Sequence, residues 1–181
     1  RGAFAPFAPL PFPQPPFDQL QDFESLLAGA DFPSIETLDA ALAASMPPRA
    51  LRFVRQDQAL FRDRLHFEQR IAELGAIAVR PSNWHDLFNA LMWLRHPRLK
   101  LALNALQVAD LALQGRGNRT RRQQSLTHVD EAGVLVACED PELFAALDAH
   151  DWHELFVCRR AQWGQQVVVH VFGHALFDLM R

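Results

Sequence analysis

The amino-acid sequence predicts a predominantly helical α+β fold, built as a single domain with one short β-hairpin. Three observations predict this class. Apolar residues recur every three or four positions over much of the chain, strand-like alternation is concentrated between residues 123 and 138, and no internal repeat is evident. With 181 residues, of which 49% are hydrophobic, the chain is long enough to bury one core.

Composition excludes several classes of protein. The formal net charge of −3 argues against a surface that attracts nucleic acid or anionic lipid as a whole. No stretch approaches the roughly 18 consecutive apolar residues that span a bilayer, so we expect a soluble, cytoplasmic protein without a membrane partner. Cys138 and Cys158 lack C-x-x-C spacing, which favours a reducing compartment, with one disulfide between them as the alternative.

The first 17 residues form a proline-rich arm, and residues 18–181 form the predicted domain. Six of the twelve prolines lie in the arm, interleaved with phenylalanines. Proline lacks an amide donor and favours polyproline II, so the arm is not a helix. We expect it to bury Phe4, Phe7, Phe12 and Phe17 on the domain surface, with a protein partner for the arm as the alternative. Because the chain begins at Arg1 and not at methionine, we expect a trimmed or processed chain.

Helices and one strand are predicted in the first half of the domain. Ser34 is a candidate N-cap for a helix that stops before Pro47. Residues 51–54 are predicted to form a short strand, and a helix is predicted from Phe67 to Leu74 with its end at Gly75.

The strongest helical pattern begins after Ser82 and ends at Pro97, which can start a second helix over residues 98–113. The apolar residues of the helix that begins after Ser82 share one helical face, so we expect them to be buried together. They are Trp84, Leu87, Phe88, Leu91 and Leu94.

The β-hairpin is predicted from strands 125–129 and 134–138, with Gly133 free to take a positive φ in the turn. Helices should follow over residues 141–149, 151–163 and from about 166 to the end of the chain.

A polar stripe runs beside the apolar face of the Ser82 helix. The stripe lacks the lysine and glutamate of an ordinary solvated surface, so we expect it to be half buried. The structural alternative is that its side chains satisfy buried backbone groups or support the helix N-terminus. The stripe contains Ser82, His85, Asp86, Asn89, Trp93 and His96.

Three further groups of residues could support chemistry. The hairpin segment 127–131 offers carboxylates for a metal or a general base, although an Asp at a turn commonly binds its own backbone. His170 and His174 have the i, i+4 spacing of zinc ligands, but the glutamate of H-E-x-x-H is absent, and packing is the commoner reason for such a pair. Residues 116–122 contain four arginines that could grip a phosphate, or form a solvated loop.

Other signatures of catalysis are absent. No G-x-S-x-G, G-x-G-x-x-G, P-loop or kinase motif occurs in the sequence, which disfavours serine or cysteine nucleophiles and nucleotide cofactors. The His150–Glu154 cluster is explained by helix capping at Asp151.

The sequence contains three distinctive motifs, Asn83-Trp-His-Asp-Leu-Phe-Asn-Ala-Leu-Met-Trp-Leu-Arg-His-Pro-Arg98, Leu126-Thr-x-x-Asp130-Glu131-x-Gly133 and Phe172-Gly-His174-Ala-Leu. These motifs resemble a bacterial family known as domain of unknown function 3025. The resemblance runs from about Pro33 to the end and implies a native boundary beyond Arg181. It implies no function, but it favours His174 over His170. The motif positions that it nominates are His85, Asp86, Asn89, Asp130, Glu131 and His174.

Two functions are consistent with these residues, and whether the protein is an enzyme stays open. One is a non-catalytic interaction or scaffold module, in which the polar residues form a buried network. The other is a metal-dependent hydrolase acting on an anionic, phosphate-containing substrate. Nucleic acid would bind only through residues 116–122. In the hydrolase hypothesis His85, Asp130, Glu131 and His174 bind a divalent metal, Asp86 and Asn89 complete the catalytic group, and Arg121, Arg122 and Trp93 bind substrate.

Overall fold

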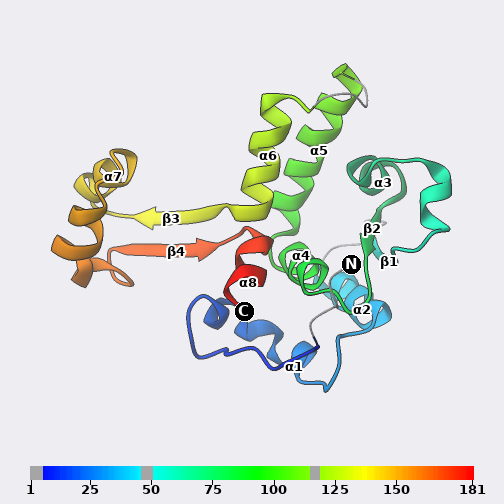
Figure 1. Ribbon diagram of the computed structural model, residues 1–181, viewed down its shortest axis with the longest axis horizontal. Helices are drawn as coiled ribbons and strands as arrows, with labels where there is room; N and C mark the ends of the chain where they lie inside the picture. Colours follow the sequence, from blue (N-terminus) through cyan, green and yellow to red (C-terminus); the bar gives the residue numbers. More distant parts are fainter. Residues whose placement is uncertain (1–5, 46–50, 115–118) are drawn as a thin grey trace.

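A computed structural model of the protein describes residues 6–45, 51–114 and 119–181. Figure 1 shows a helical body, from which the strands β3 and β4 lead to a smaller lobe. The described residues form helices and two separate two-stranded sheets, which confirms the predominantly helical α+β class. None of the described helices has both the length and the apolar character needed to cross a membrane.

The proline-rich N-terminal segment packs against the body and leads into a 3-10 helix, η1 (Phe17–Phe23). The Phe7 ring stacks on Trp84 with 5.2 Å between centroids, and Phe17 is buried. These contacts remove phenyl surface from water, as the sequence led us to expect. Phe4 lies outside the described residues.

A short turn, α1 (Glu24–Leu27), precedes α2 (Ile35–Ser45). The hydroxyl of Ser34 accepts a hydrogen bond from the backbone N–H of Thr37 at 3.2 Å, so Ser34 caps α2 as predicted. The helix ends at Ser45, and Pro47 lies outside the described residues.

The next part of the body contains a parallel sheet of two short strands. β1 (Arg52–Arg55) lies within one residue of its predicted position, and it pairs with β2 (Ala76–Val79), which the sequence pattern did not predict. Between them lie η2 (Leu60–Asp63) and α3 (Phe67–Leu74). The predicted end of α3 is confirmed, because Gly75 adopts the left-handed conformation with φ 62°.

The central helix of the body is α4 (Trp84–Arg95). Its N-cap is Asn83, since Asn83 Oδ1 accepts a hydrogen bond from the Asp86 N–H at 3.0 Å. Burial of the predicted apolar face is confirmed, and each of its residues is at most 7% exposed. Those residues are Trp84, Leu87, Phe88, Leu91 and Leu94.

The next two helices, α5 (Pro97–Gln114) and α6 (Arg121–Ala132), form an antiparallel pair. The predicted strand over residues 125–129 is therefore wrong, because this segment is helical. A capping box starts α6: the Gln123 N–H donates to the Thr120 hydroxyl, and the Thr120 N–H donates to Gln123 Oε1, both at 2.9 Å. The β-branched residues that favoured a strand were outweighed by this cap and by packing against α5.

The predicted hairpin is replaced by a pairing between distant strands. β3 (Val134–Cys138) pairs antiparallel with β4 (Val167–Val171), and α8 (His174–Met180) follows β4. The helix predicted from residue 166 is therefore wrong in its first part, where β-branched valines favour a strand. Gly133 has φ −72°, so it does not use the positive φ that was expected.

The lobe lies at the outer end of the β3–β4 ribbon (Figure 1). It contains α7 (Pro141–Asp148), which Asp140 caps, and the short segments η3 (Glu154–Cys158) and η4 (Arg160–Gln162). These replace the continuous helix predicted over residues 151–163. Cys138 and Cys158 are both free thiols. The lobe has its own small core of Leu143, Ala146, Leu155 and Val167.

Candidate metal centre

Three helix ends meet beside the β3–β4 ribbon. His85 lies in the first turn of α4, Glu131 in the last turn of α6, and His174 is the first residue of α8. The carbonyl of Gly133 accepts hydrogen bonds from the N–H groups of Phe172, at 3.0 Å, and Gly173, at 2.7 Å. These bonds hold the start of α8 against the end of α6.

Gly173 makes this contact sterically feasible. A Cβ atom built on Gly173 would lie 2.5 Å from the Glu131 carbonyl oxygen and would overlap the backbone of Ala132. Since no side chain fits there, only glycine lets α8 approach α6 so closely. The close approach is what brings His174 to Glu131.

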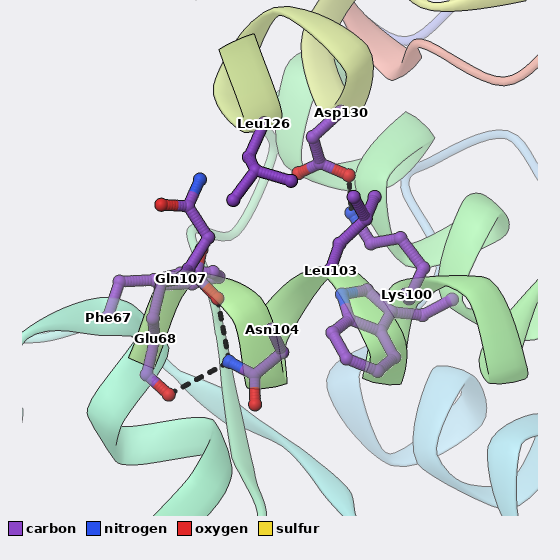
Figure 2. A pocket seen from close by; sticks show the side chains of 9 residues that line it. Phe67, Glu68, Lys100, Leu103, Asn104, Gln107, Leu126 and Asp130 are labelled. Carbon is purple, nitrogen blue, oxygen red and sulfur yellow. Dashed lines mark hydrogen bonds and ion pairs between the residues drawn. The ribbon is translucent and has the colours of Figure 1, made fainter. Parts of the chain in front are cut away.

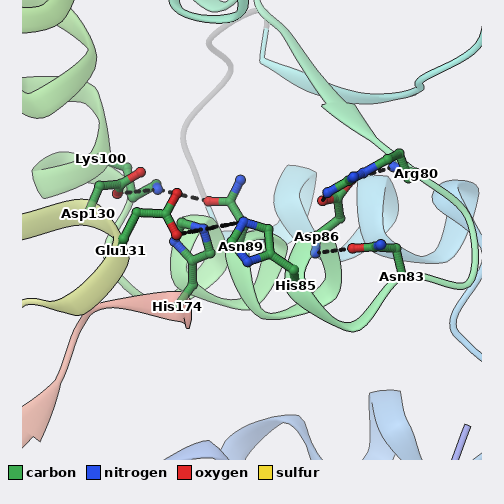
Figure 3. A network of polar contacts seen from close by, with 9 residues as sticks. All are labelled: Arg80, Asn83, His85, Asp86, Asn89, Lys100, Asp130, Glu131 and His174. Atoms are coloured by element: carbon green, nitrogen blue, oxygen red, sulfur yellow. Dashed lines mark hydrogen bonds and ion pairs between the residues drawn. The ribbon is translucent and has the colours of Figure 1, made fainter. Parts of the chain in front are cut away.

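The three side chains converge on one point (Figure 3). The Nε2 atoms of His85 and His174 are 3.1 Å apart, and Glu131 Oε2 lies 3.7 Å from the first and 3.4 Å from the second. Ligands about 2.1 Å from a metal ion lie about 3.0–3.4 Å from one another. Within the described part of the chain, this is the one group of three or more His, Cys, Asp or Glu side chains whose donor atoms are this close.

His174 is neutral and so keeps a lone pair for a metal. Burial is the main cause that lowers the pKa of His174 to about 3, and electrostatic interaction with Lys100 and His85 lowers it further. The backbone of Asp130 and the negative charge of Asp86 raise the pKa of His174, but these effects are smaller. Nδ1 of His174 is a buried atom without a hydrogen-bond partner among the described residues.

The cluster is buried on one side and open on the other. The His174 side chain is 3% exposed, whereas the His85 and Glu131 side chains are 33% and 38% exposed. All three line a pocket of about 320 Å³, and most of its other lining residues are polar. An ion held by three ligands here would keep a coordination position open toward the pocket, as catalytic zinc sites do.

Asp86 and Arg80 form a separate pair on the same pocket wall. Arg80 donates to Asp86 from its backbone N–H at 2.7 Å, from Nε at 3.0 Å and from Nη2 at 2.6 Å. The hydrogen bond to Asp86 is the main cause that raises the pKa of Arg80. Asp86, which was predicted to join the catalytic group, instead fixes the turn between β2 and α4.

Asp130 and Asn89 bind a buried lysine. Lys100 Nζ lies 2.5 Å from Asp130 Oδ1 and 2.8 Å from Asn89 Oδ1, and its side chain is 3% exposed. Asp130, predicted as a metal ligand, is thus directed to Lys100 (Figure 3). Lys100 was not predicted to belong to this site, although it is the only lysine in a chain with eighteen basic residues.

The predicted substrate-binding residues lie away from the pocket surface. Arg121 and Arg122 are in the first turn of α6, where Arg122 pairs with Asp110 at 3.2 Å, and neither lines the pocket. Trp93 is 2% exposed and belongs to the core. The pocket is lined instead by Arg119, from the same basic segment, while Arg116 lies outside the described residues.

Comparison with known proteins gives one match. A family described as "Protein of unknown function (DUF3025)" matches residues 51–181, which confirms the resemblance, although the match begins later than Pro33. Neither a curated protein nor a solved structure matches the chain.

Proposed function

Because the chain belongs to the DUF3025 family of proteins of unknown function, we propose a function from the site itself. In this proposal His85, Glu131 and His174 bind one divalent metal ion, and the ion activates water to hydrolyse an anionic, phosphate-containing substrate. The observation that supports it is the convergence of two imidazole nitrogens and one carboxylate oxygen at an open polar pocket. Two His and one Glu form a common ligand set for catalytic zinc, and the bound ion lowers the pKa of its water to about 7.

The charges of the pocket favour an anionic substrate. Asp86 is neutralised by Arg80, and Asp130 by Lys100. A divalent ion would balance the negative charges of Glu131 and Glu68, so that Arg119 leaves the pocket with a net positive charge. Arg119 adds a further positive charge and forms no ion pair with the described residues. Guanidinium groups bind phosphate oxygens through paired N–H donors, so Arg119 takes the anion-binding role first expected of Arg121 and Arg122.

Metal analysis tests the proposal most directly. Untagged protein, stripped with a chelator and titrated with zinc, manganese or iron(II), is expected to bind about one ion per chain. His85→Ala and Glu131→Gln should each weaken binding at least about a hundredfold, because each removes a ligand. Both side chains are partly exposed, so these variants should fold. His170→Ala is the matched control, since His170 lies on β4 outside the cluster.

A second candidate function is a non-catalytic interaction or scaffold module with a buried polar network. The buried Lys100–Asp130–Asn89 hydrogen bonds favour it, because a fully satisfied polar network can fix a fold without catalysis. If wild-type protein binds none of the three metals, and His85→Ala lowers the melting temperature, the scaffold function replaces the hydrolase.

Anion binding by Arg119 gives a separate prediction. Sulfate or phosphate should raise the melting temperature above that in chloride of equal ionic strength by about 3 °C when the anion is near ten times its Kd. Arg119→Ala should abolish the difference. Arg121→Ala should leave it intact, because Arg121 is exposed and does not line the pocket. Equal melting temperatures in the two salts for wild-type protein would remove Arg119 from the substrate site.

A further inference from the structure

A carboxylate that no sequence motif nominated, Glu68, lines the same pocket as the metal cluster. It extends from the first turn of α3, whereas the cluster comes from α4, α6 and α8. Figure 2 shows a second, smaller pocket that shares Glu68 and Asp130 with the first, with Glu68 and Asn104 on one side and the Lys100–Asp130 pair on the other. Glu68 therefore lines the cluster's pocket from a different helix than the metal ligands.

We propose that Glu68 is the proton acceptor for the water bound at the His85, Glu131 and His174 centre. This inference rests on the proposed function. When the water attacks the phosphorus atom, its O–H bond breaks and its proton moves to Glu68, while the new O–P bond forms. The bond to the leaving oxygen then breaks, and Glu68 returns the proton to that oxygen.

The pairing of the acidic residues singles out Glu68. Of the acidic side chains that line the pocket, Asp86 is paired with Arg80 and Asp130 with Lys100, while Glu131 lies against the two histidines of the proposed metal centre. Glu68 forms no ion pair with the described residues. Its Oε2 accepts a hydrogen bond from the neutral Asn104 amide at 2.7 Å. Glu68 is thus the pocket carboxylate that is held by a neutral hydrogen-bond donor and by no ion pair among the described residues, which suits it to take up a proton.

The surroundings of Glu68 suit a group that gains and loses a proton. Burial raises the pKa of Glu68 above the ordinary value, and the negative charge of Asp130 acts in the same direction. The hydrogen bond from Asn104 opposes this shift, as do the charges of Lys100 and Arg119. A carboxyl with raised pKa exchanges protons more readily near neutral pH than an exposed glutamate does.

The proposal can be tested without knowing the natural substrate. Cobalt(II) replaces the bound metal, and its visible spectrum is followed as pH rises. If Glu68 accepts a proton from the bound water, the two groups titrate as a pair, so the wild-type spectrum should change in two steps. Glu68→Gln keeps the side-chain shape and an oxygen acceptor for Asn104, and it should show one step with unchanged cobalt stoichiometry. Glu68→Ala should show the same single step.

Glu73→Gln is the matched control, since Glu73 is an exposed glutamate of α3 that does not line this pocket. It should retain both steps. Two steps in Glu68→Gln, or one step in the wild type, would overturn the assignment of Glu68 while leaving the metal centre in place. Failure of the wild type to bind cobalt would overturn the proposed function and, with it, the role of Glu68.

Discussion

Gly173→Ala is expected to weaken metal binding at least about a hundredfold and to lower the free energy of unfolding by about 2–3 kcal/mol. The added methyl group would collide with the backbone of Ala132 and the carbonyl of Glu131, neither of which can rotate away. Relief of the collision requires α8 to move from α6. His174 would then leave Glu131, and the two bonds to Gly133 would break. Metal titration and chemical denaturation measure the two effects.

Gly29→Ala provides the control for this substitution. A Cβ atom on Gly29 would be 3.5 Å from its nearest neighbour, the Asp31 carbonyl oxygen, which is an ordinary contact. This variant should bind metal like the wild type. If Gly173→Ala also keeps wild-type affinity, the α6–α8 contact does not position the metal ligands.

Phe88→Ala is expected to cost about 3–5 kcal/mol of unfolding free energy. Phe88 is 0% exposed, and its ring lies 5.6 Å from the rings of both Trp84 and Phe177 and 6.4 Å from that of Phe17. The substitution would leave a cavity where the N-terminal segment, α4 and α8 meet. Denaturant titration measures the loss, and Leu113→Ala, at a residue 82% exposed, should change stability by less than about 0.5 kcal/mol. A loss below about 1 kcal/mol for Phe88→Ala would mean that the core collapses around the missing ring.

The helices that the sequence predicted well have local signals for both their position and their ends. The apolar face of α4 repeats at helical spacing, α3 ends at a left-handed glycine, and α7 begins at Asp140 followed by proline. The strands were harder to predict because their signals are not local. β2 is a run of four buried apolar residues, and β4 pairs with a strand about thirty residues earlier in the chain.

The residues of the metal centre were partly predictable, because the sequence motifs include them. Motif positions nominated His85, Glu131 and His174, and the fold brings these three together. They also nominated Asp86 and Asp130, which bind Arg80 and Lys100 instead. An acidic residue looks alike in sequence whether it faces a metal or a buried cation, and only tertiary contacts distinguish the two.

The path of β4 has a consequence for how the protein tolerates a break in its chain. Val167 is buried in the core of the lobe, whereas Val171 and the following α8 belong to the core of the body. The Gln19 side chain bonds the backbone of Val169 and Val171, which fastens the inner half of β4 to the N-terminal segment. A protease that nicks the lobe would therefore leave two fragments joined by buried contacts. The C-terminal fragment would still present His174 to its partners on the other fragment.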